Sequence, residues 1–177
     1  MTSAVTGTVT SAVTGTVTSA VVGVPRSARR TCDDAVVDDF DPATSDLYAA
    51  ARTALEQAYC PYSGYPVGAA VRTTSGTVHV GCNVENAAYP LGSCAEAGAL
   101  AAMVLAGERA VSEVVTVTAG PVPGTPCGGC RQRIREFAAP STPVHSTTVD
   151  GVVVSMTVEE LLPSAFGPDH LGPLPRS

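Results

Sequence analysis

Apolar positions recur at helical spacing from about residue 42 onward. Ser45 is placed to cap a helix over residues 46–59. Its apolar face would consist of Leu47, Ala50, Ala51, Ala54, Leu55 and Ala58. The turn-rich segment at residues 60–66 contains two prolines and a glycine, and we expect it to end this helix.

The rest of the chain alternates short β-branched runs with helical segments. Strands are predicted over residues 67–73, 77–83, 111–119, 144–149 and 152–156, and helices over residues 94–106 and 127–138. Thr157-Val158-Glu159-Glu160 has the pattern of a capping box, which predicts a short last helix that Pro163 ends. Strands that alternate with helices are typical of an α/β fold, with a sheet covered on both faces.

The first 25 residues follow a different pattern. TSAVTGTV occurs twice and is followed by TSAVVGVP, and no charged residue precedes Arg26. Three short repeats bury little surface, so we expect residues 1–41 to be a disordered repeat tail and linker. The alternative is a β-repeat with a role of its own. A folded domain over residues 42–170 and a flexible tail over 171–177 complete the expected organisation.

Composition limits the kinds of molecule that the protein is expected to bind. The chain has 177 residues and a net charge of −6, with 10 basic and 16 acidic residues, which disfavours a nucleic-acid groove. No apolar run is long enough to span a bilayer, and no signal peptide is recognisable, so we expect a cytoplasmic protein without a membrane partner. In such a protein, clustered cysteines indicate metal binding rather than disulfides.

Two cysteine motifs carry the candidate chemistry. Ser93-Cys94-Ala95-Glu96 is followed by Pro126-Cys127-Gly128-Gly129-Cys130, and both motifs open predicted helices. Thiolates from Cys94, Cys127 and Cys130 suit a tetrahedral Zn²⁺, and three protein ligands leave the fourth position for water, as in catalytic sites. Glu96 can face that water without ligating the metal. The alternative is a structural Cys₄ site with Cys60 or Cys82 as fourth ligand, which leaves Glu96 unexplained.

Several longer stretches carry a resemblance to a known family. They are residues 58–70, 81–89, 94–96, 126–132 and 161–166, and together they span roughly residues 45–168. With them the chain resembles the small homotetrameric, zinc-dependent cytidine deaminases. The resemblance implies a three-layer α/β/α fold with a five-stranded mixed sheet. It also implies deamination of cytidine and 2′-deoxycytidine to uridine and 2′-deoxyuridine, with release of ammonia, in pyrimidine salvage.

The resemblance also implies roles for individual residues. Zinc would bind Cys94, Cys127 and Cys130, and Glu96 would carry protons from water to the ring nitrogen and the leaving amine. Contacts to the nucleoside substrate would come from Tyr65, Asn83, Glu85, Ala95 and Phe166. Asn83 and Glu85 would bind the ribose 3′-hydroxyl, and Tyr65 stands where the family usually has a phenylalanine against the pyrimidine. Phe166 and the Tyr62/Ser63 region would complete the sites of neighbouring subunits.

One departure from the family pattern and three alternative functions stay open at this point. Many family members carry arginine directly after the catalytic glutamate, where it donates to the cysteine sulfurs, but this chain has Ala97. Either Arg131 takes that role, or the N–H groups of the helix N-termini, with Gly128 and Gly129, suffice. The alternative functions are deamination of another aminopyrimidine such as blasticidin S, editing of a nucleic acid, and a non-catalytic zinc-stabilised assembly.

Overall fold

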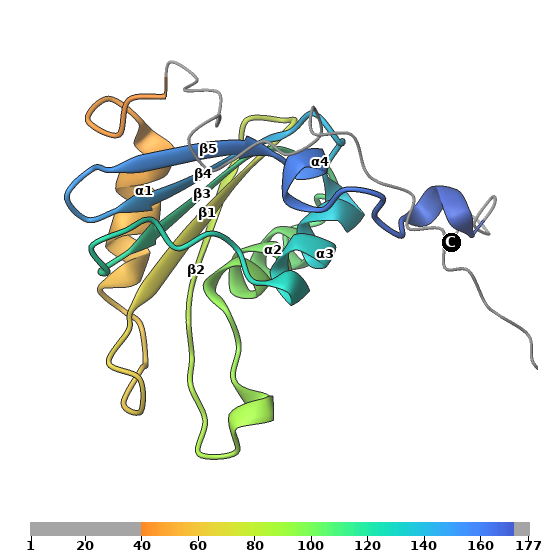
Figure 1. The fold of residues 1–177 in the computed structure, drawn as a ribbon. Coiled ribbons are helices and arrows are strands. Elements are labelled where there is room, and N and C mark those ends of the chain that lie inside the picture. Colours follow the sequence, from red (N-terminus) through yellow and green to blue (C-terminus); the bar gives the residue numbers. More distant parts are fainter. Residues whose placement is uncertain (1–39, 172–177) are drawn as a thin grey trace, which may run out of the picture.

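A computed structural model describes residues 40–171 of the chain (Figure 1). The predicted repeat tail and most of the predicted linker lie outside these residues, as does most of the predicted C-terminal tail. The expected α/β class is confirmed, because a five-stranded mixed sheet lies between two layers of helices. Among residues 40–171, no helix is long and apolar enough to cross a membrane.

The sheet has the strand order β2-β1-β3-β4-β5. The strands are β1 (Val67–Thr73), β2 (Val78–Cys82), β3 (Val111–Thr118), β4 (Pro143–Thr148) and β5 (Val153–Thr157). The helices are α1 (Asp46–Leu55), α2 (Ala95–Leu105), α3 (Gly128–Phe137) and α4 (Val158–Leu161), with short 3₁₀ turns at Tyr89–Leu91 and Pro168–His170. β3 and β4 run parallel, whereas the other neighbouring pairs are antiparallel.

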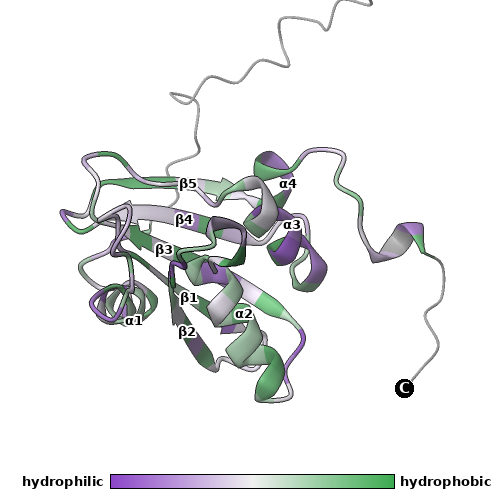
Figure 2. Ribbon diagram, turned by 90° about the horizontal axis from the view of Figure 1, so that it is seen from below, coloured by the Kyte–Doolittle hydropathy of each residue, from purple (hydrophilic) through white to green (hydrophobic). Residues whose placement is uncertain are grey.

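Each face of the sheet has its own hydrophobic core. α1 packs Leu47 and Ala51 against Ala70, Val115 and Val117 on one face. α2 and α3 cover the other face, where Ala69, Val71, Leu100, Met103, Val114, Ile134 and Val144 are buried together. Figure 2 shows the sheet between these two helical layers. Alternate residues of each central strand therefore face opposite cores, as the predicted period of two requires.

Very close packing joins β2 to α2. A Cβ atom added at Gly81 would overlap the Ala95 carbonyl oxygen and the Ala99 nitrogen, so only glycine lets the strand approach the helix this closely. The contact brings the end of β2 beside the first turn of α2. Residues 83–85 and 94–96, which are distant in the sequence, consequently lie at the same edge of the fold.

The first helix is shorter than predicted. It ends at Leu55 rather than at residue 59, and Glu56 caps it. The Tyr59 nitrogen donates to the Asn83 carbonyl oxygen at 3.0 Å, and the Tyr59 carbonyl oxygen accepts from the Glu85 nitrogen at 2.7 Å. Because Tyr59 pairs with the segment beyond β2, its backbone cannot remain helical. The predicted capping box at Thr157 and Glu160 is confirmed.

Phe40, the first residue that the structure describes, packs on His145. The Phe40 ring stacks on the buried His145 ring with centroids 4.0 Å apart, and His145 Nδ1 lies 2.7 Å from the Ser155 hydroxyl. Asp41 also bonds forward, because its carboxylate accepts from the Ala43 nitrogen at 2.9 Å. Phe40 and Asp41, which lie just before the predicted boundary at residue 42, therefore already make contacts.

Candidate metal centre and substrate pocket

The three predicted metal ligands come together at two helix N-termini. Cys94 caps α2, Cys127 caps α3, and Cys130 lies in the first turn of α3. The Sγ atoms of Cys94 and Cys127 are 3.8 Å apart, and all three sulfurs lie within 4.8 Å of one another. Sulfurs bound tetrahedrally to zinc at ~2.3 Å lie ~3.8 Å apart, so the cluster fits this ion.

Neither of the other two described cysteines joins the cluster. Of the groups that residues 40–171 offer to a metal, only Cys94, Cys127 and Cys130 come together as three. The Cys82 thiol donates to the Gln57 carbonyl oxygen at 3.5 Å, and Cys60 lies partly buried in the turn after α1. The three-ligand interpretation thus fits the structure better than the Cys₄ alternative.

Glu96 lies against the sulfur cluster. It occupies the first turn of α2 and is 5% exposed. Its Oε2 atom accepts from the Cys130 thiol at 3.3 Å. A buried carboxylate beside a cluster of thiols costs free energy unless a positive charge accompanies it, which is a second reason to place a cation here.

The local environment shifts the pKa values of the three thiols in different directions. Burial raises the pKa of Cys94, and burial together with the Glu96 charge raises the pKa of Cys130. Burial also acts on Cys127, but hydrogen bonds from the Cys130 N–H, from the two neighbouring thiols and from the Gly129 N–H outweigh it and lower the Cys127 pKa. The expected contribution of the N-terminal N–H groups of α3 is therefore present at Cys127.

A pocket of about 360 Å³ opens beside the cluster. Its wall contains Glu96, Cys94 and Cys127, and four of the predicted substrate contacts, namely Tyr65, Asn83, Glu85 and Ala95. Sequence reasoning missed Tyr89, Thr118, Gly124 and Thr125 as further wall residues. The last two precede the second cysteine motif directly, which is the signal that could have identified them.

The Asn83 side chain is engaged with the backbone of β1. Its Oδ1 accepts from the Val67 nitrogen at 2.8 Å, and its Nδ2 donates to the Tyr65 carbonyl oxygen at 2.9 Å. One amide hydrogen and one lone pair remain for a ligand. Asn83 therefore fixes the backbone that carries Tyr65, whereas its predicted bond to the ribose stays a prediction.

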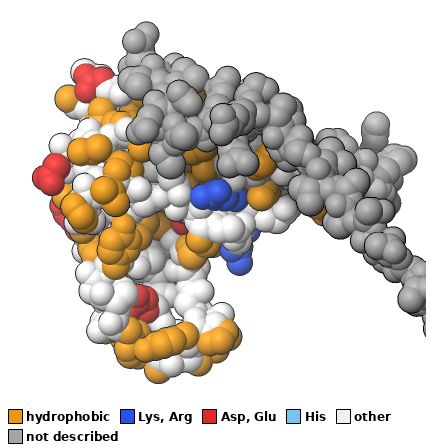
Figure 3. Space-filling view, viewed as in Figure 1, with side chains coloured by type: hydrophobic (Ala, Val, Ile, Leu, Met, Phe, Trp, Pro, Cys, Tyr) orange, Lys and Arg blue, Asp and Glu red, His pale blue; other side chains and the backbone are white. Residues whose placement is uncertain are grey.

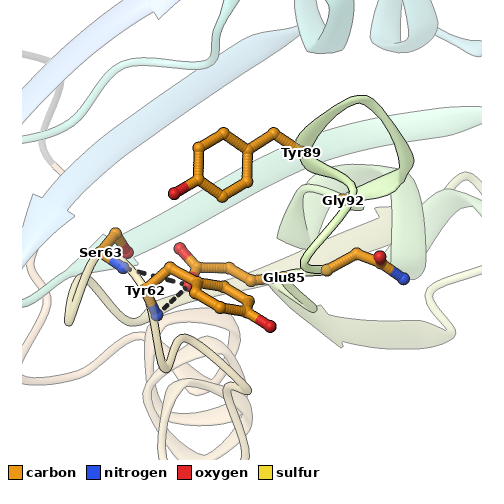
Figure 4. Close-up of a pocket in the computed structure, with 6 residues that line it drawn as sticks. Tyr62, Ser63, Glu85, Tyr89 and Gly92 are labelled. Atoms are coloured by element: carbon orange, nitrogen blue, oxygen red, sulfur yellow. Dashed lines mark hydrogen bonds between the residues drawn. The ribbon is translucent and has the colours of Figure 1, made fainter.

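Glu85 is held by the turn that follows α1. Its Oε2 accepts from the Tyr62 nitrogen at 2.9 Å and from the Ser63 nitrogen at 3.1 Å (Figure 4). The Ser63 hydroxyl, followed by these two N–H groups, lowers the pKa of Glu85. A second cavity of about 370 Å³ adjoins the first at Glu85 and Tyr89. The charged carboxylate is thus fixed where the two cavities meet.

Arg131 does not take the role of the arginine expected at position 97, where this chain has alanine. Its guanidinium donates to the Pro126 carbonyl oxygen at 2.7 Å, to the Leu161 carbonyl oxygen at 2.9 Å and to the Thr125 hydroxyl at 3.1 Å. These bonds fix the segment before Cys127 and tie it to α4. The structure therefore favours the helix N-terminal N–H groups as the source of compensation.

Phe166 lies outside the wall of the pocket in this chain. It is 58% exposed, and its ring stacks on His170 with centroids 5.1 Å apart. Gln132 donates from Nε2 to the Phe166 carbonyl oxygen at 2.9 Å. The predicted contact of Phe166 with the site of a neighbouring subunit stays a prediction.

Comparison with known proteins gives consistent similarities. The family described as the cytidine and deoxycytidylate deaminase zinc-binding region matches residues 43–146. A cytidine deaminase from Sporosarcina psychrophila is 46% identical over 127 residues, which cover 71% of this chain and 92% of that protein. One from Halalkalibacterium halodurans is 42% identical, with 64% and 86% covered. The crystal structure of a Burkholderia pseudomallei cytidine deaminase has a TM-score of 0.65 at 43% identity, covering 68% of this chain and 96% of that one.

Proposed function

The chain belongs to the cytidine and deoxycytidylate deaminase family, and we propose that it deaminates cytidine and 2′-deoxycytidine by hydrolysis. The reaction adds water at C4 of the cytosine ring and releases ammonia, so that cytidine becomes uridine. Blasticidin S deaminase activity is not favoured, because the similar proteins are cytidine deaminases.

The chain's own residues divide the work between metal binding and proton transfer. Cys94, Cys127 and Cys130 would hold the zinc ion, which supplies Lewis acidity that makes water nucleophilic at neutral pH. Glu96 faces both the sulfur cluster and the pocket, so its carboxylate can accept a proton from water. The same carboxylate can then return protons to the pyrimidine N3 and to the departing amine.

The pocket would orient the nucleoside by its remaining walls. We infer that Tyr65 lies against the pyrimidine and that the Ala95 backbone contacts its edge, because both border the pocket next to Glu96. Asn83 and Oε1 of Glu85 would bind the ribose 3′-hydroxyl. A hydroxyl at that position is absent from an internal nucleotide of a polymer, which favours free nucleosides over nucleic acid.

The observation that carries the proposal is the contact of Glu96 with the three-sulfur cluster at one wall of the pocket. The test follows the loss of cytidine absorbance with zinc-loaded protein, with 2′-deoxycytidine and blasticidin S measured side by side. We expect turnover of both nucleosides and little of blasticidin S. Folded, zinc-loaded protein without turnover of either nucleoside would refute the proposal.

We also propose that the protein is a homotetramer that serves pyrimidine salvage in the cytoplasm. Tyr89 and Leu91 are 77% and 72% exposed on the segment between β2 and α2, and Figure 3 shows apolar side chains gathered at the lower end of the molecule. An apolar groove also runs between α2 and α3, beside Ala101, Val104 and Phe137. Exposed apolar surface of this kind favours subunit contacts. Light scattering tests the tetramer, and a monomer with full activity would contradict it.

A further inference from the structure

The phenol of Tyr65 fills a notch between two glycines. A Cβ atom added at Gly120 would lie 3.1 Å from both Oη and Cε2 of Tyr65, and its three nearest atoms all belong to that ring. A Cβ atom added at Gly124 would lie 2.8 Å from the Thr118 Cγ2 and 3.0 Å from the Tyr65 Oη. Neither glycine adopts a left-handed φ, so side-chain packing rather than backbone conformation favours glycine at both positions. Tyr65 occupies the space at Gly120, and Thr118 and Tyr65 together occupy it at Gly124.

Both glycines belong to the segment that leads to a metal ligand. Residues 119–126, which we call the β3–α3 loop, connect β3 to Cys127 at the start of α3. The Gly124 nitrogen donates to the Thr118 hydroxyl at 3.3 Å, and the Gly124 carbonyl oxygen accepts from the Thr116 hydroxyl at 3.4 Å. These long bonds hold the middle of the loop to β3, and the Tyr65 ring contacts it from the pocket.

Tyr65 is itself held at a fixed position. Its carbonyl oxygen accepts from Asn83, and its nitrogen donates to the Ser63 hydroxyl at 3.0 Å. The ring therefore contacts the β3–α3 loop from an anchored backbone. A phenylalanine would lack the oxygen that closes off the Cβ positions of both glycines, although its ring edge would still border Gly120 through Cε2.

We propose that Tyr65 is a positioning residue for Cys127, because its phenol locks the β3–α3 loop against β3. The same ring borders the substrate pocket, so pocket and metal ligand are coupled through one side chain. This inference deepens the proposed function and rests on it for the identity of the pocket. Small displacements of a ligand weaken a metal site, so loss of the lock should accelerate metal release.

Three variants that change the packing of Tyr65 against Gly120, and one control variant, test the proposal. Gly120→Ala crowds both Oη and Cε2 of the tyrosine, Tyr65→Phe removes the oxygen, and the double variant therefore relieves one of the two close contacts of the added methyl group. Gly98→Ala is the matched control, because its Cβ would meet its nearest atom at an ordinary 3.5 Å and it lies outside the pocket wall. The readouts are the rate of zinc release to a coloured chelator, kcat and KM for cytidine, and the thermal midpoint.

We expect Gly120→Ala to release zinc roughly tenfold faster than the unaltered protein, since overpacking of this kind is costly. Tyr65→Phe should release zinc a few times faster with KM nearly unchanged. The double variant should release zinc more slowly than Gly120→Ala, because one of the two close contacts is gone, a non-additivity typical of residues in contact. If Gly120→Ala does not fold, folding of the double variant supports the lock.

Three outcomes would overturn the proposal. The first is Gly120→Ala behaving like Gly98→Ala, and the second is additive effects, or failure to fold, in the double variant. The third is a change in KM without a change in zinc release, which would leave Tyr65 a contact for the substrate alone. Failure of the proposed function is distinguishable, because the unaltered protein would then lack turnover while its zinc release could still be measured.

Discussion

The Nδ2 atom of Asn83 donates a hydrogen bond to the carbonyl oxygen of Tyr65 at 2.9 Å. Since Oδ1 of the same side chain accepts from the Val67 nitrogen, one amide closes the gap between the end of β2 and the start of β1. A residue predicted for substrate binding therefore also shapes the pocket wall. Loss of the Asn83 side chain should therefore lower the stability of the protein and raise the Michaelis constant for the substrate.

Replacement of Asn83 by alanine tests this double role. The variant leaves the Tyr65 carbonyl and the Val67 nitrogen without their partner, so we expect the free energy of unfolding to fall by about 1–3 kcal/mol. KM for cytidine should rise more than kcat falls, because the substrate wall moves while Glu96 and the thiols stay in place. Denaturant unfolding and steady-state kinetics provide the measurements.

Asn86→Ala is the matched control for that experiment. The Asn86 side chain accepts from the exposed Ala88 nitrogen at 2.8 Å, so its removal should cost little stability. Equal losses of stability in the two variants would contradict a special role for the Asn83 bridge.

Replacement of Glu96 by glutamine should separate metal binding from catalysis. The amide keeps the size of the side chain but cannot carry the proton, so turnover should fall by about 10²–10⁴-fold. Zinc content should stay close to one ion per chain, because the thiols are unaltered. Glu56→Gln at the end of α1 is the control and should retain full turnover. Activity of Glu96→Gln near that of the control would exclude Glu96 as the proton carrier.

Alkylation of the zinc-free protein should distinguish the three thiols. Cys127 is exposed and has a lowered pKa, whereas Cys130 is buried and has a raised pKa. Because the thiolate is the nucleophile, iodoacetamide should modify Cys127 fastest and Cys130 slowest at neutral pH. The preference for Cys127 over Cys94 should weaken at alkaline pH, as the Cys94 thiol begins to ionise, whereas Cys130 should stay slow. Peptide mass spectrometry gives the order, and added zinc should protect all three; fastest reaction at Cys130 would contradict the assignment.

Much of the fold could be predicted from the sequence, because the signals for strands and helix caps are local. The strand predicted at residues 67–73 is β1, and the predicted capping box at Thr157 is present, since alternation and caps depend on neighbouring residues. The predicted end of the first helix was wrong by four residues, since the helix ends at Leu55 rather than at residue 59. Its last turn is decided by the distant pairing of Tyr59 with Asn83 and Glu85, which no local pattern records.

The candidate site was predictable where spacing alone places the side chains. Cys94 and Glu96 share one turn of α2, and Cys127 and Cys130 share one turn of α3, so each motif fixes half of the cluster. The partners of Arg131 and the contact of Tyr65 with Gly120 depend on the path of the β3–α3 loop. A loop path follows from tertiary packing, and the sequence does not record it.

The contact between Gly81 and Gly98 gives an asymmetric prediction. A Cβ atom at Gly81 would overlap backbone atoms of Ala95 and Ala99, whereas one at Gly98 would meet the Gly81 Cα at 3.5 Å. Gly81→Ala should therefore push β2 away from α2 and destabilise the protein by about 1–3 kcal/mol or more. Gly98→Ala should be tolerated, since alanine also favours the helix. Thermal unfolding measures both, and equal effects would contradict the close contact at Gly81.

Glu85 should give the protein a component of stability that depends on pH. Its pKa is lowered in the folded state, chiefly by the Ser63 hydroxyl and then by the N–H groups of Tyr62 and Ser63. A lowered pKa favours the folded state above the ordinary carboxylate pKa of ~4.3, and this stabilisation disappears as the pH falls through the lowered value. Glu85→Gln lacks the titrating group. The difference in thermal midpoint between the unaltered protein and Glu85→Gln should thus be largest above about pH 5 and should shrink in more acidic solution.

Ser63→Ala provides the matched test of the cause. It removes the hydroxyl that lowers the Glu85 pKa but keeps the two backbone N–H donors, so its pH dependence should lie between those of the unaltered protein and Glu85→Gln. Thermal midpoints between pH 3 and pH 7 provide the measurement. A difference between the unaltered protein and Glu85→Gln that stays constant, or grows as the pH falls, would mean that the carboxylate is not held in its charged form by this turn.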